Sequence, residues 1–315
     1  MNRKLSRVAA GQGGVFSRRQ ALACGYTVQA MQARLADGRW ERIRYGQYAE
    51  SLDLSHLPRW ERERVRHERL VHAAVNSMRP GSVAVSHQSA AVIHGAPTWG
   101  LELEEAHLTR LEDLRSGRLA QVRHHRGTLT PADLTEIRGL RSVTVARALV
   151  ETACTTSFEV AVVLADALCR LRSPDEDEFD RLARMFEFWP GSTTARAALA
   201  FRDPQAESVG ESRLRVLMHN EGLPAPLLQM PIRDAAGLIG RVDFFFPGDH
   251  TVVEFDGLLK YADGSADVLV REKNREDRLR GLGLEVVRVT WPELGRPEQV
   301  AIRIRQAFTR ARRSA

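Results

Sequence analysis

The chain has 315 residues and a mass of 35.3 kDa, enough for two or three domains. Hydrophobic residues make up 43% and charged residues 27%, which is typical of a soluble globular protein and excludes a disordered or fibrous one. The net charge is +6, and no stretch approaches the ~18–20 apolar residues of a membrane span. We therefore expect a cytoplasmic protein with no membrane partner.

The charge is unevenly distributed along the chain. Residues 1–50 carry 9 basic and 3 acidic side chains, and residues 257–315 carry 13 and 8, whereas the stretch between them is acidic. Basic ends favour a polyanionic partner, most plausibly DNA. A solvated surface with a chance asymmetry is the alternative.

Residues 1–54 have the pattern of a winged helix-turn-helix. Ser17 and Thr27 are suited to cap short helices over 18–24 and 28–36, and the aromatic stretch 40–48 reads as a two-stranded wing. The second helix would enter the major groove, while the wing would meet phosphates. The DNA-binding candidates are Thr27, Gln29, Gln32 and Arg34 on the helix, and Arg42 and Arg44 on the wing. A segment that mediates protein contacts is the alternative.

Residues 55–200 are predicted to form a mostly helical middle domain. Helical patterns cover 58–78, 86–94 and 142–172, and two strand-like pieces lie at 106–111 and 121–126. The histidines of this region match no familiar metal-ligand spacing, so we expect packing and surface roles for them.

In residues 204–315 helical and strand patterns follow one another, which predicts an α/β domain with a mixed sheet. The expected order is a helix at 207–220, strands at 227–233, 238–246 and 251–256, a helix at 267–282, a strand at 284–290 and a helix from 297.

Two of these strands bring carboxylates together. If their hairpin is symmetric about residues 247–250, Asp243 faces Glu254 on one side of the sheet, at roughly 4.5–5.5 Å between Cβ atoms. Such carboxylates repel unless a cation lies between them, and Mg²⁺ or Mn²⁺ prefers their oxygen atoms. The same register pairs Arg241 with Asp256, either as a salt bridge or with Asp256 as a further ligand. A shifted register would separate the carboxylates.

Lysine is rare in the chain, since only Lys4, Lys260 and Lys273 stand among 46 basic residues. Two of the three follow the carboxylates closely. A lysine can position or deprotonate an attacking water and neutralise phosphate, so Lys260 and Lys273 join Asp243 and Glu254 as catalytic candidates. A solvated helix charge is the alternative for Lys273.

The sequence RVDF…VEFDG…K, followed by EKNREDRLRGLGLEVVRVTW, resembles the very-short-patch-repair-like branch of the PD-(D/E)xK nucleases over residues 204–312. The resemblance implies a restriction-endonuclease-like fold, with metal held by Glu211, Asp243 and Glu254. Asp256 stands where the family's E-x-K motif has its lysine.

The first 50 residues, with SHQSAAVIHGAP (86–97) and VTVARALVETA (143–153), are similar to antitoxin-like regulators of type IV abortive-infection systems. The expected function is therefore a Mg²⁺-dependent DNA endonuclease in DNA repair or phage defence, targeted by a winged helix. The alternative is a DNA-binding regulator or antitoxin with an inactive nuclease-like domain. A homodimer and a toxin, antitoxin or defence partner remain open.

Overall fold

The computed structural model describes residues 1–112, 116–257 and 266–314, and the chain divides into two compact units. The first unit contains Met1–Leu164 and Leu171–Ala200, and the second contains Ala165–Arg170 and Phe201–Ala315. Helical and α/β parts both occur, as the multidomain prediction requires. Among the residues described, no helix is long and apolar enough to cross a membrane.

The N-terminal part of the first unit packs three helices on a small antiparallel sheet of order β1-β3-β2. Side-chain oxygens of Asn2, Ser17 and Thr27 cap the three helices, so the two predicted caps are present. Its core includes Phe16 and Trp40, whose ring centroids lie 4.7 Å apart. The elements are α1 (Arg3–Ala10), β1 (Val15–Ser17), α2 (Arg18–Ala23), α3 (Val28–Ala36), β2 (Trp40–Arg44) and β3 (Gln47–Glu50).

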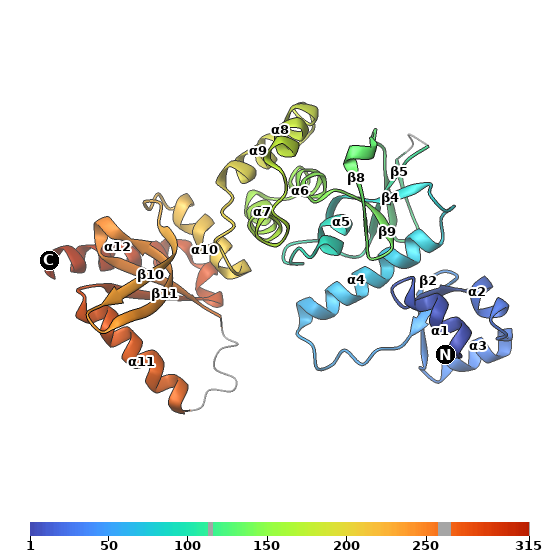
Figure 1. Ribbon diagram of the computed structural model, residues 1–315, viewed down its shortest axis with the longest axis horizontal. Coiled ribbons are helices and arrows are strands. Elements are labelled where there is room, and N and C mark those ends of the chain that lie inside the picture. Colours follow the sequence, from blue (N-terminus) through green and yellow to red (C-terminus); the bar gives the residue numbers. More distant parts are fainter. Residues whose placement is uncertain (113–115, 258–265, 315) are drawn as a thin grey trace. The chain divides into compact units, whose positions relative to one another are not determined.

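The rest of the first unit contains helices, as expected, and also a six-stranded mixed sheet of order β6-β7-β5-β4-β9-β8 (Figure 1). Two of its strands lie at the strand-like pieces expected at 106–111 and 121–126. The others have three or four residues, too few for an alternating pattern to be recognised. The strands of this sheet are β4 (Val83–Val85), β5 (Ala106–Arg110), β6 (Gly117–Leu119), β7 (Val122–His125), β8 (Leu134–Ile137) and β9 (Leu140–Val143).

This part of the chain also contains helices. They are α4 (Arg59–Asn76), α5 (His87–His94), α6 (Val145–Ala153), α7 (Phe158–Arg172), α8 (Glu176–Met185) and α9 (Ser192–Phe201). The predicted helix over 142–172 is thus two helices. They are separated at Cys154–Ser157, where Gly191 packs so tightly that a Cβ on it would lie 2.0 Å from the Cys154 carbonyl oxygen.

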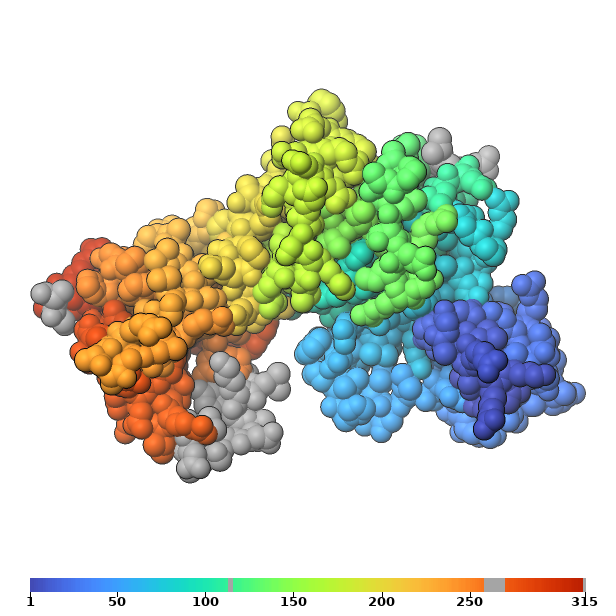
Figure 2. All heavy atoms as spheres, viewed as in Figure 1, coloured from blue at the N-terminus to red at the C-terminus, as the bar shows by residue number. Residues whose placement is uncertain are grey.

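The N-terminal part is docked on the remainder of its unit rather than tethered to it. Arg69 of α4 forms an ion pair with Glu41 of β2, and Asn76 donates to the Gln47 side chain at 2.8 Å. In Figure 2 the blue N-terminal residues accordingly lie directly against the cyan and green residues of this unit. Residues of the β2–β3 hairpin and of α4 therefore form one surface.

The second unit is a three-layer α/β arrangement around a sheet of order β10-β11-β12-β13. Leu214 and Ile304 bring α10 and α12 onto one face, whereas Leu279 brings α11 onto the other (Figure 1). Strands β10 and β13 form the two edges, and β10 carries Pro231. The elements are α10 (Val209–Asn220), β10 (Leu227–Asp234), β11 (Gly237–Phe246), β12 (Thr251–Asp256), α11 (Ala266–Gly281), β13 (Glu285–Thr290) and α12 (Pro297–Ser314).

The register of the central hairpin agrees with the symmetric prediction as far as the strands pair. Phe246 pairs with Thr251 and Phe244 with Val253. Beyond that pair, the Asp243 carboxylate accepts a hydrogen bond from the Phe255 N–H at 2.8 Å. A side chain thus bridges the two strands at the point where the predicted carboxylates lie.

Gly210 lets α10 approach β12 closely beside this point. A Cβ on Gly210 would lie 1.9 Å from Cε1 of Phe255, so any residue other than glycine would clash with the ring here. The approach places Glu211, the next residue of α10, at the end of β12 where the Asp243–Phe255 bond lies.

We predict that Gly210→Ala destabilises the second unit by about 1–3 kcal/mol, the usual cost of overpacking. The free energy of unfolding measured in urea checks this. Gly281→Ala is the matched control, because Gly281 also lies in a helix but has open space around its Cα. Equal stability of the two variants would show that the Gly210 contact is unimportant.

Candidate carboxylate site and nucleic-acid surface

Glu211 and Asp243 are joined through a residue that the sequence analysis missed, Gln229 of β10. The Gln229 Nε2 atom lies 3.0 Å from Glu211 Oε2 and 3.5 Å from Asp243 Oδ1. Glu211 also accepts from the Ser208 hydroxyl and is only 7% exposed. Two carboxylates thus converge on one amide group.

The backbone of Gln229 is unusual for a strand residue. Its φ is +53°, in the left-handed region that non-glycine residues rarely adopt. Strained backbone of this kind concentrates at functional sites, where the surrounding structure holds it in place.

Glu254, the third predicted carboxylate, is held by arginine. Its Oε1 atom lies 2.6 Å from Arg275 Nη2, and its Oε2 atom lies 4.0 Å from Arg288 Nη2. Burial alone would lower the pKa of the Arg275 guanidinium, but Glu254 and Glu272 raise it above its usual value. Arg275 therefore remains a cation in this site.

The other predicted residues of this unit are dispersed. Arg241 forms an ion pair with Glu207 at 2.5 Å, and half-buried Asp256 ends β12 opposite Thr290. Lys273 is exposed on α11, with no side-chain partner among the described residues. Lys260 lies outside the described residues.

A signal for Arg275 was present in the sequence. Since lysine is rare, arginine is the cation to look for beside a carboxylate in this chain. Arg275 lies two residues after Lys273. Charged residues at helical spacing are, however, also typical of a solvated helix face, so the spacing alone does not single out Arg275. Gln229 has no local sequence signal, because its role depends on a backbone conformation.

The predicted DNA-binding residues of the first unit fall into two groups. Thr27, Gln29, Gln32 and Arg42 are exposed, although Thr27 also caps α3. Arg34 instead lies over the Tyr26 ring at 4.9 Å, and Arg44 donates to the Ala120 carbonyl at 3.0 Å. Burial lowers the pKa of Arg44. Arg34 thus packs within the N-terminal part, whereas Arg44 joins that part to the rest of the first unit.

Next to Arg42 the structure has a groove of about 680 Å³ between β2 and α4. Arg62 and Arg66 of α4 also line it, and the next arginine on that helix face is Arg69, which is paired with Glu41. The side chains of Arg42, Arg62 and Arg66 have no partner within the described part of the chain. Three cations therefore remain available along one groove.

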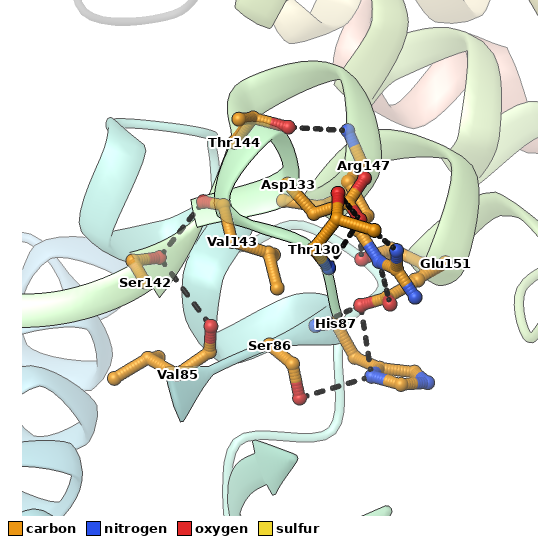
Figure 3. A network of polar contacts seen from close by, with 12 residues as sticks. Val85, Ser86, His87, Thr130, Asp133, Ser142, Val143, Thr144, Arg147 and Glu151 are labelled. Atoms are coloured by element: carbon orange, nitrogen blue, oxygen red, sulfur yellow. Dashed lines mark hydrogen bonds and ion pairs between the residues drawn. The ribbon is translucent and has the colours of Figure 1, made fainter. Parts of the chain in front are cut away.

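A second polar cluster lies buried in the first unit and includes residues of the stretches 86–97 and 143–153. Arg147 of α6 bonds Glu151 at 2.8 Å and forms an ion pair with Asp133 at 3.1 Å (Figure 3). Glu151 in turn accepts from the His87 backbone N–H at 3.1 Å. Ser86 and Glu151 both meet Nδ1 of His87, so the three do not form a Ser-His-acid relay, and the cluster ties α5 and α6 to the sheet.

Buried imidazoles continue this cluster. The rings of His87 and His125 stack at 3.5 Å, and His125 contacts His107 at 3.1 Å. Burial lowers the pKa of His67 to about 4, of His87 and His125 to about 3, and of His107 to about 2. The cations Arg123 and Arg147 lower the pKa of His87 further.

These shifts predict acid sensitivity of the first unit. The unfolded chain binds protons below the ordinary histidine pKa of about 6.5, whereas these folded imidazoles do not. The free energy of unfolding should therefore be highest above pH 6.5 and fall as the pH is lowered toward 4, by up to about 1.4 kcal/mol per pH unit for each histidine.

Urea unfolding at pH 7, 6 and 5 measures this slope. A Trp291→Phe background leaves four tryptophans, all in the first unit, as fluorescence probes. His125→Gln should reduce the slope, whereas His56→Gln, at an exposed position, should reduce it less. Stability that does not change from pH 7 to pH 5 would contradict the prediction.

Comparison with known proteins finds partial relatives. No protein-family profile matches the chain. Two uncharacterized proteins of Mycobacterium tuberculosis, from strains CDC 1551/Oshkosh and H37Rv, are 38% identical to it over 123 residues. The match covers 39% of this chain and 45% of each relative, so the chain spans less than half the length of either.

Proposed function

We propose that this protein is a divalent-metal-dependent DNA endonuclease of the PD-(D/E)xK type, whose first unit binds DNA through a winged helix. The convergence of Glu211 and Asp243 on the Gln229 amide is the observation that carries this proposal. An amide N–H₂ is the positive end of a dipole, and here it lies between two carboxylates, as a cation would.

The donor chemistry of the site fits Mg²⁺ or Mn²⁺. Oxygen atoms of Glu211 and Asp243 and the amide oxygen of Gln229 are the ligand types these ions prefer, as is the carboxylate of Glu254 on β12. A bound divalent ion would supply activation of a water and stabilisation of the leaving oxygen. The chain's own residues hold the donors in place, through the Ser208 and Phe255 hydrogen bonds.

A regulator with an inactive nuclease-like domain is the second candidate, and one observation favours it. Within the described residues no group of three His, Cys, Asp or Glu side chains is arranged to hold a metal ion. Glu254 is instead paired with Arg275, and the lysine of the E-x-K motif is replaced by Asp256. Such a protein would bind DNA without cutting it.

The two candidates are separated by incubating the pure protein with supercoiled and linear DNA in Mg²⁺, Mn²⁺ or EDTA. For a nuclease, Glu254→Gln should lower metal-dependent cleavage at least ~100-fold. Loss of a residue that only supports a metal ligand costs up to about 100-fold, and loss of a ligand itself should cost no less. DNA binding should survive, because the substitution removes a negative charge near phosphate. A parent protein that cuts no DNA and gains no thermal stability with either metal leaves the regulator.

DNA binding has its own test in the groove beside the wing. Arg62→Ala/Arg66→Ala should weaken duplex binding and reduce the slope of log affinity against log salt by about 2, because each phosphate contact contributes roughly 0.9. Fluorescence anisotropy over a salt series measures both. Arg184→Ala/Arg196→Ala, which removes two exposed arginines elsewhere in the first unit, is the matched control. Equal slopes for the two double variants would exclude the groove from the DNA surface.

A further inference from the structure

Arg275 is built into the carboxylate site rather than resting on its surface. Its guanidinium contacts Glu254 at 2.6 Å, the Arg241 carbonyl at 2.8 Å and Glu272 at 3.0 Å, and the side chain is 21% exposed. Gly240 of β11 leaves space for it, because a Cβ there would lie 3.0 Å from Arg275 Nε. Three partners and this space fix one orientation of the planar group.

The other nearby cation has different partners. Arg288 lies 2.6 Å from Glu272 and 3.2 Å from Glu276, but its distance to Glu254 is 4.0 Å. Arg275 is therefore the cation that neutralises Glu254. Glu211 accepts hydrogen bonds from the Gln229 amide and the Glu207 backbone N–H, which carry only partial charges. Glu254 instead pairs with the full positive charge of Arg275.

We propose that Arg275 is the internal counter-cation of Glu254 and sets the affinity of this site for divalent metal. The inference rests on the proposed function. A metal ion bound to Glu254 would compete with the Arg275 ion pair, because the guanidinium on one carboxylate oxygen repels a second cation on the same group. If metal displaced it, Arg275 would keep its proton and become a cation available to a phosphate group.

Isothermal titration of the full chain with Mn²⁺, in the absence of DNA, tests this exchange. Arg275→Ala should bind Mn²⁺ about tenfold more tightly than the parent, since metal binding no longer breaks a charge-assisted hydrogen bond. Arg275→Lys should lie between them, because lysine restores the charge without the planar contacts. Arg278→Ala is the matched control, since Arg278 lies on the same helix and pairs with Asp234 at 2.7 Å.

A double-mutant cycle makes the test specific to the pair. In a Glu254→Gln background, Arg275→Ala should no longer change Mn²⁺ affinity. Circular dichroism in EDTA confirms that each variant is folded, and Arg275→Lys supplies the comparison if Arg275→Ala is not.

Several outcomes would overturn the inference. They are unchanged or weaker Mn²⁺ binding by Arg275→Ala, a gain equal to that of Arg278→Ala, and a gain that persists in the Glu254→Gln background. Failure of the proposed function looks different, because cleavage is measured separately. A protein that shows the expected exchange and cuts no DNA would support this inference and remove the nuclease.

Discussion

A buried charge needs a partner of opposite sign, and in this chain that partner is almost always a guanidinium. Arg147 holds Glu151 and Asp133 in the first unit, and Arg215 holds Asp166 at 2.8 Å in the second. Because the planar guanidinium group donates several hydrogen bonds, each arginine also fixes the elements that carry its partners. The docking of the β2–β3 hairpin on α4 and the position of Glu254 both depend on such contacts.

The same constraint frames the two functional candidates. Without metal, Glu254 needs a cation such as Arg275 beside it. This is true of a nuclease that later binds metal and of a regulator that never does. Removal of only one partner would leave an uncompensated half-buried charge, which is costlier than removing both. Single substitutions of Arg275 and of Glu254 and the double substitution are therefore all needed before the pair is assigned to catalysis or to stability.

The second unit could be predicted well because its strands are long. The Phe244–Val253 register followed from the turn at Pro247–Asp249, and alternation placed Phe244 and Phe246 in the core. In the first unit, two strands were expected at 106–111 and 121–126, but strands such as Val83–Val85 were missed because three residues are too few to show an alternating pattern. Of the candidate site, Asp243 and Glu254 were predicted by type and spacing, and Glu211 by the family resemblance. Arg275 had a signal that also fits a solvated helix face, and Gln229 had none, because its contacts are made across the fold.

The edges of the second unit's sheet bear on self-association. Pro231 interrupts the row of N–H donors on β10, and β13 carries Glu285 and Arg288. Proline and charged residues at sheet edges discourage the addition of a further strand from another molecule. A second copy of this chain is therefore not expected to extend this sheet, and the second unit resists growth into a continuous intermolecular sheet or fibril.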